Sequence, residues 1–265
     1  MFSAGLLAAG IAAASPGSVR EFHRTLPLSA DGHLSISTYK GSITVTSWDR
    51  AEADVSARVE ADGTEDDAEE KVARTEVRID GGGSSVRVRS DYDKVRDHSF
   101  AGLFGFGFGF GFGLHKGTLP LVHYTIRMPA TARLDIEDYK SRTSVAGLRA
   151  DLKLHTYKGE VVVDNLDGAA HVETYKGDVR VSFARYAHPS RFETYKGTFE
   201  VRLPKDSRFE LDADGGRRGE VDSDFQVATR STSRRGGERA RGSVNGGGPS
   251  LRFESSRGSL RLRGI

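Results

Sequence analysis

The most conspicuous chemical pattern in the sequence is a repeated Tyr-Lys-Gly triplet. It begins at Tyr39, Tyr157, Tyr175 and Tyr195, and a variant with serine in place of glycine begins at Tyr139. Tyrosine offers an apolar ring and a hydroxyl and lysine a cation, so a row of such pairs could hold sugar rings or another protein. The triplet could equally mark a structural corner, because glycine reaches the positive φ that tight turns need.

The spacing of the triplets favours the corner interpretation. Corner positions recur at steps of 18, 18, 20, 22, 23 and 16 residues, at Ser141, Gly159, Gly177, Gly197, Gly219, Gly242 and Gly258. Apolar and polar residues alternate on both sides of each corner, which predicts two short strands per unit with one buried face. Two strands cannot bury that face alone, so the units are expected to stack. The chain is therefore predicted to be all-β, a two-sheeted β-solenoid of repeated short strands.

Stacking in register would turn the corners into a ladder. Tyrosines on neighbouring coils would lie about 4.8 Å apart, with the lysines in a parallel column. Glutamates at Glu137, Glu173 and Glu193 would offset the repulsion between lysines. We treat this face as a ligand-binding candidate, while the rings could also serve simply to cover the corners. The candidate residues are Tyr139, Tyr157, Tyr175, Tyr195, Lys140, Lys158, Lys176 and Lys196.

The region before the repeats has similar but less regular strands. Alternating segments occur at 33–48, 53–61, 75–80, 84–90 and 121–129. One short helix is expected near 64–74, because Thr64 and Asp67 have the spacing of a capping box. We divide the chain into a signal-peptide-like segment (1–15), an irregular N-terminal β region (16–130) and the repeats (131–265), the last two continuous with each other.

Two segments suggest contact with membranes or export. Residues 1–14 form an apolar run ending in small residues, which is typical of a secretory signal although no Lys or Arg precedes it. Within the Phe-Gly loop at 100–117, Phe and Gly alternate, which would place five rings on one face of an extended chain: Phe104, Phe106, Phe108, Phe110 and Phe112. That strip could touch a membrane or partner, or it could be a flexible low-complexity insertion.

The amino-acid composition argues against several classes of function. The chain has no cysteine, which excludes thiolate metal sites and cysteine nucleophiles, and its net charge of +2 gives no general case for nucleic acid. The arginines at 230–241 lack the interleaved aromatics that stack on bases, and the aspartates at 212–224 lack EF-hand spacing and have Arg217 and Arg218 beside them. We expect no cofactor, no metal site and no nucleic-acid partner.

The signal-like start, the segment "SISTYKGSITVTSWD" at 35–49 and the run at 128–181 resemble a bacterial putative-adhesin family of β-strand-repeat proteins, a domain of unknown function. The resemblance implies a two-sheeted β-solenoid on an exported protein of the periplasm, envelope or exterior, and it implies no catalytic residue. We expect a non-enzymatic protein that binds a glycan or a cell-surface protein. A carbohydrate-active enzyme on the same scaffold and a purely structural envelope protein are the alternatives.

Overall fold

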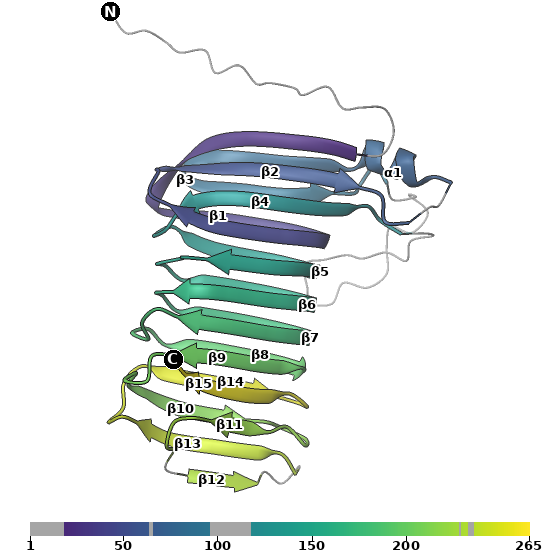
Figure 1. Ribbon diagram of the computed structural model, residues 1–265. Helices are drawn as coiled ribbons and strands as arrows, with labels where there is room; N and C mark the ends of the chain where they lie inside the picture. The colour runs from purple at the N-terminus through teal and green to yellow at the C-terminus, as the bar shows by residue number, and fades with distance from the viewer. Residues whose placement is uncertain (1–18, 64–65, 96–117, 228, 233–235) are drawn as a thin grey trace, which may run out of the picture.

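The computed structural model describes residues 19–63, 66–95, 118–227, 229–232 and 236–265. These residues form fifteen strands and one helix, so the predicted all-β class is confirmed. The strands belong to one long sheet whose members are stacked along a single axis (Figure 1). The signal-like segment 1–15 and the Phe-Gly loop at 100–117 lie outside the described residues.

The regular part of the stack is built from parallel coils. It comprises β5 (Arg133–Ala146), β6 (Leu152–Leu166), β7 (Ala170–Phe183), and the pair β8 (Ser190–Lys196) and β9 (Thr198–Leu203). Equivalent residues pair directly from coil to coil, as Leu154 does with Val172 and Lys158 with Lys176. Because the side-chain period is two, this register keeps the buried rows of all coils on one side.

The corners differ from the prediction in one respect. We expected two separate strands joined by a turn, but β5, β6 and β7 each run unbroken through the corner. Backbone pairing continues there, since Gly159 pairs with Gly177. The chain breaks into two strands only at Gly197, among the coils from β5 to β9.

Close approach between coils explains the corner glycines better than turn geometry does. A Cβ at Gly177 would lie 2.0 Å from the carbonyl oxygen of Gly159, and a Cβ at Gly159 would lie equally close to that of Ser141. Gly41 and Gly197 do have positive φ, but Gly159 and Gly177 do not. The expected need for positive φ is therefore wrong at these two corners, where the absence of a side chain is what matters.

The C-terminal part of the stack does not follow chain order. Its strands are β10 (Phe209–Asp214), β11 (Val221–Ser223), β12 (Thr229–Thr232), β13 (Glu238–Val244), β14 (Ser250–Ser255) and β15 (Ser259–Gly264). β14 pairs in parallel with β8 on one side and β10 on the other, while β15 pairs with β9 and β11. The last residues of the chain thus form a coil inserted between two earlier ones, as the yellow strands in Figure 1 show.

Because the last coil is inserted, the end of the stack is formed by β12 and β13, which pair antiparallel. The insertion also corrects one expectation. Gly242 was counted as a corner, but it lies within β13 opposite Leu211. In space, Gly258 follows Gly197 and precedes Gly219, since a Cβ at Gly219 would lie 2.1 Å from the carbonyl oxygen of Gly258.

The opposite end of the stack is closed by the N-terminal region. The first elements are β1 (Val19–Trp48), β2 (Glu52–Glu60), α1 (Ala68–Arg74), β3 (Glu76–Asp91) and β4 (Leu121–Pro129). The second half of β1 is itself a coil, paired with β5, and β3 and β4 add parallel strands beyond it. Helix α1 begins after Asp67 with no side-chain cap, later than the capping-box pattern suggests, and Thr64 lies outside the described residues.

Because apolar and polar residues alternate along the strands, the buried side chains form one continuous apolar interior from β1 to β15. Its largest fully buried side chains include Phe183, Phe192, Phe199, Phe209 and Phe253. Within the described residues, no helix is both long enough and apolar enough to cross a membrane.

Candidate functional site

The corner tyrosines form a continuous stack of rings, which we call the Tyr ladder. Neighbouring ring centroids lie 4.7–4.8 Å apart and neighbouring planes differ by at most 4°. Tyr39 joins the ladder as a fifth member, which the sequence analysis left out although its triplet was recognised. The members are Tyr39, Tyr139, Tyr157, Tyr175 and Tyr195.

Both ends of the ladder are covered. At one end Tyr92 contacts Tyr39 edge-on, with centroids 6.3 Å apart. At the other, the guanidinium of Arg257 lies 5.6 Å from the centre of the Tyr195 ring, a cation–π contact. Since each inner ring has a ring on both faces, the exposed members of the ladder present their ring edges, not their faces, to solvent. The three members Tyr157, Tyr175 and Tyr195 are 42%, 44% and 37% exposed.

The lysines beside the ladder fall into two kinds. Lys40 is buried and forms an ion pair with Asp62. Lys140, Lys158, Lys176 and Lys196 are exposed, and within the described part of the chain no carboxylate oxygen lies within 4.0 Å of their amino groups. These four are the free cations of the face.

The glutamates do not compensate the lysines as expected. Glu173 lies 4.0 Å from the ring nitrogen of His155, while Glu193 pairs with Arg191 and lies 3.6 Å from His171. Both carboxylates therefore contact basic side chains in the strand segments before the corner, and they do not contact the lysine column. The surface therefore carries three parallel stripes that run along the stack. The first stripe consists of carboxylates, the second of tyrosines and the third of lysines.

A groove runs between the carboxylate stripe and the Tyr ladder. It has a volume of about 680 Å³ and is lined by the four tyrosines from Tyr139 to Tyr195 together with Glu173, Glu193, Glu254 and His155. Its floor includes Thr174 and Thr194, whose buried hydroxyls have no hydrogen-bond partner in the structure. The groove spans several coils, so it fits an extended ligand better than a compact one.

Asp138 is the one strongly perturbed carboxyl group at the groove, among the described residues. It stands where the other coils have threonine, and Ser141 stands where they have glycine. Asp138 accepts hydrogen bonds from the Ser141 backbone N–H, from the Ser141 hydroxyl and from Thr156. Burial nevertheless raises its pKa to about 6, because desolvation outweighs those hydrogen bonds.

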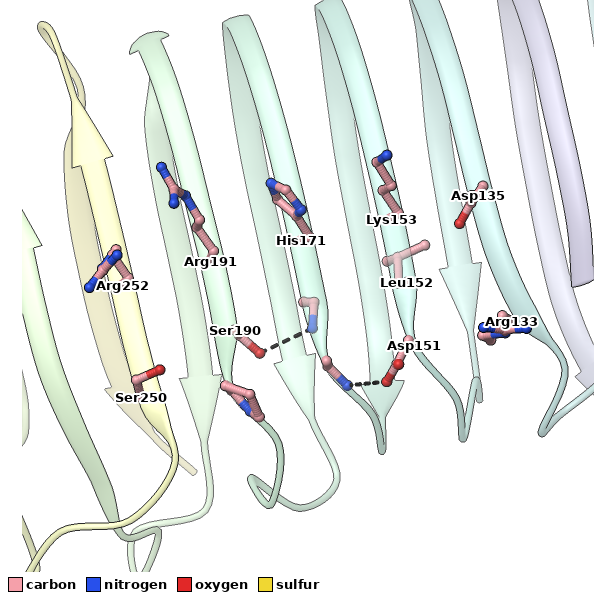
Figure 2. Close-up of a pocket in the computed structure, with 13 residues that line it drawn as sticks. Arg133, Asp135, Asp151, Leu152, Lys153, His171, Ser190, Arg191, Ser250 and Arg252 are labelled. Atoms are coloured by element: carbon pink, nitrogen blue, oxygen red, sulfur yellow. Dashed lines mark hydrogen bonds between the residues drawn. The ribbon is translucent and has the colours of Figure 1, made fainter. Parts of the chain in front are cut away.

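A second hollow lies further from the corner on the same strands. It has a volume of about 420 Å³ and exposes a row of basic residues, one on each of four successive coils (Figure 2). The row consists of Lys153, His171, Arg191 and Arg252, which are paired coil to coil by the sheet register. We call it the cation row. Sequence analysis missed it, although period two places the first three on one outward face; Arg252 joins through the inserted coil.

A Ser-His-Glu chain occurs elsewhere on the outer surface. The Ser42 hydroxyl lies 2.8 Å from Nδ1 of His123, and Nε2 of His123 lies 3.1 Å from a Glu60 carboxylate oxygen. Ser42 belongs to a strand paired on both sides, with Arg142 and with His123, so its backbone groups are used within the sheet. The Ser42 backbone N–H is therefore engaged in the sheet and not directed at an oxyanion. The chain is a cross-strand polar contact.

The four aspartates of the acidic cluster all form ion pairs with arginines, but only two of them pair with the basic segment 230–241. Asp212 and Asp214 pair with Arg241 and Arg239, and Arg263 pairs with both Asp222 and Asp224. These ion pairs come from arginines other than Arg217 and Arg218, which lie beside the aspartates in the sequence. Within the described residues, no group of three or more His, Asp or Glu side chains is arranged to hold a metal. The Phe104–Phe112 strip lies outside the described residues.

Comparison with known families and structures identifies the architecture. Residues 131–245 match the Toastrack DUF4097 family. A putative cell adhesion protein from Clostridium sporogenes has a similar fold, with a TM-score of 0.51 and 11% identity over 93% of this chain and 100% of that one. A putative adhesin from Bacteroides fragilis is 8% identical over 92% of this chain and 97% of that one, with a TM-score of 0.24. No curated protein matches the sequence.

Proposed function

We propose that this protein, a member of the Toastrack DUF4097 family of bacterial putative adhesins, is an exported, non-enzymatic protein that binds a glycan or a cell-surface protein through its corner face. The corner face comprises the Tyr ladder and the exposed lysines Lys140, Lys158, Lys176 and Lys196. The observation that carries the proposal is the long groove beside a ladder of uniformly spaced, solvent-exposed tyrosine edges. One structure of similar fold, described as a putative cell adhesion protein, is consistent with it.

We infer that each coil consists of two arms, before and after the corner, which face each other as two sheets. Phe192 precedes a corner and Phe199 follows it, yet their ring centroids lie 5.6 Å apart. Such contact requires the chain to fold back across a shared interior. This arrangement leaves the outer surfaces long, flat and repetitive, which suits recognition of a polymer or a broad protein surface.

The chemistry of the corner face favours hydrogen bonding over ring stacking. The tyrosine faces are occupied by one another, so a sugar ring could not lie flat on an inner member of the ladder. The hydroxyls and ring edges of Tyr157, Tyr175 and Tyr195 are exposed, with carboxylates on one side and free ammonium groups on the other. A ligand with many hydroxyl or amide groups along an extended chain would use all three stripes.

The test is retention of the chain on insoluble glycans and on immobilised cell-surface proteins. Replacing Tyr157, Tyr175 and Tyr195 by alanine should weaken retention by about ten-fold or more, because exposed tyrosines at binding surfaces carry a large share of affinity. The matched control replaces the same three residues by phenylalanine, which keeps the ring stack and removes the hydroxyls. Retention lost in both variants would identify the hydroxyls as the binding groups; loss in the alanine variant alone would identify the ring edges.

Circular dichroism of each variant separates binding from folding. An alanine variant that binds as well as the original chain would refute the corner face as the binding site. If the alanine variant loses both the β circular-dichroism signal and its retention, the result would count against a binding role distinct from the fold. Release of soluble sugar during the same assay would refute the non-enzymatic part of the proposal.

A further inference from the structure

The cation row has the geometry of a second binding site, separate from the corner face. Strand pairing sets its members side by side, Lys153 with His171, His171 with Arg191, and Arg191 with Arg252. Neighbouring strands are about 4.8 Å apart, so four members extend over about 14 Å along the stack. Figure 2 shows these side chains on successive strands around one hollow.

Acidic residues bound the row at both ends. Asp135 pairs with Lys153 in the register and marks one end, and Asp212 pairs with Arg252 and marks the other. Asp135 lies 3.1 Å from the ring nitrogen of His33, and Asp212 is held by Arg241 at 2.7 Å. These carboxylates are therefore directed to partners outside the row, and they limit its length to four coils.

Two of the four members are free of local neutralisation. Across the described ranges, no carboxylate oxygen lies within 4.0 Å of the side-chain nitrogens of Lys153 or Arg252. Arg191 is held by Glu193 and, at 3.3 Å, by Glu254, which fixes the guanidinium but leaves further N–H donors unused. Arg133 and the carboxylate-bearing Asp151 also line the hollow. A ligand would therefore meet a pre-positioned arginine with the unpaired Arg252 on one side. On the other side lie His171, which faces Glu193 at 3.6 Å, and beyond it the unpaired Lys153.

We propose that the cation row binds a linear anionic polysaccharide, with its carboxylate or sulfate groups placed on successive coils. Regularly spaced cations along a straight line match a polymer with one charge per ring, since a sugar ring is about as long as the spacing between strands. Arginine forms paired hydrogen bonds with carboxylate and sulfate oxygens, which adds orientation to charge. Nucleic acid fits poorly because the nearby tyrosine faces are stacked on one another and cannot receive bases.

The experiment measures retention of the full chain on immobilised polygalacturonate and heparin, with neutral dextran as the uncharged matrix. Replacing Lys153, Arg191 and Arg252 by glutamine should lower affinity for the anionic matrices about ten-fold or more, because each lost contact is a charge-assisted hydrogen bond. Added salt should release the original chain progressively. The matched control removes three positive charges from the corner face by replacing Lys158, Lys176 and Lys196 with glutamine.

The control variant also separates this site from the corner face. Loss of retention in the cation-row variant with retention preserved in the lysine variant would support the proposal. Equal loss in both, no loss in either, or no retention of the original chain would overturn it, and stronger retention on polyphosphate than on both polysaccharides would overturn the choice of ligand. If the triple variant loses its β circular-dichroism signal, the single changes R252Q and K153Q carry the same test.

Discussion

At the scale of single residues, Asp138 shows how one coil departs from the repeat. Its carboxyl is buried at the corner, and its partner Ser141 fills the position that glycine takes in the other coils. Because the two substitutions occur together and bond to each other, they act as a pair. Burial raises the pKa of Asp138 from 3.8 to about 6.

The raised pKa predicts a specific dependence of stability on pH. Between pH 4 and pH 6 the folded chain holds the proton of Asp138 while the unfolded chain has released it, so the free energy of unfolding should fall as pH rises through this window. The expected loss is about 2–3 kcal/mol, and it should be complete above pH 6. Tyr92, which also lies near Asp138, stays protonated throughout, since burial raises its pKa. Urea unfolding at pH 4 and pH 7 measures the difference.

The matched comparison uses D138N and D135N. D138N removes the titrating group, so its unfolding free energy should lack the fall between the two pH values. D135N removes the same charge from a half-buried position on the same strand, beside His33, and should keep the fall. Identical pH dependence in all three proteins would contradict the assignment to Asp138.

At the scale of elements, the close stacking of coils determines which substitutions the corner positions tolerate. G177A would place a methyl group 2.0 Å from the carbonyl oxygen of Gly159, so two coils must separate locally. Overpacking of this kind is expected to cost about 2–3 kcal/mol of unfolding free energy. The neighbouring K176A alters an exposed side chain and should cost less than about 0.5 kcal/mol. Urea midpoints measure both, and an unchanged midpoint for G177A would contradict the close-contact explanation.

The sequence predicted the coils well wherever chain order and spatial order agree. Alternation fixed the buried rows of β5 to β9, such as Val161 and Val163, and the triplet spacing fixed the Tyr ladder. Alternation specifies which face is buried but not which strand is the neighbour. For that reason nothing in the pattern placed Gly258 between Gly197 and Gly219, or Arg252 beside Arg191. The cation row depends on that unexpected neighbour.

At the scale of the whole molecule, the inserted C-terminal coil joins two parts of the stack. The coil formed by β14 and β15 lies between β8 with β9 and β10 with β11, so the parts contact each other mainly through residues 250–264. Stacks of repeats are stabilised by contacts between neighbours, which makes this coil a bridge. Phe253, Leu260 and Leu262 are fully buried in it.

Deletion of residues 250–265 should therefore uncouple the end of the stack from the rest. We expect amide hydrogen exchange to lose protection across 209–244, because β10 and β11 lose their parallel partners, while β5 to β7 keep theirs. Adding the missing segment as a peptide should restore protection in 209–244. A matched peptide with serine at Leu251, Phe253, Leu260 and Leu262 should not, because it cannot fill the apolar interior. Full protection of 209–244 in the truncated chain, or collapse of protection throughout the stack, would contradict the bridging role of the last coil.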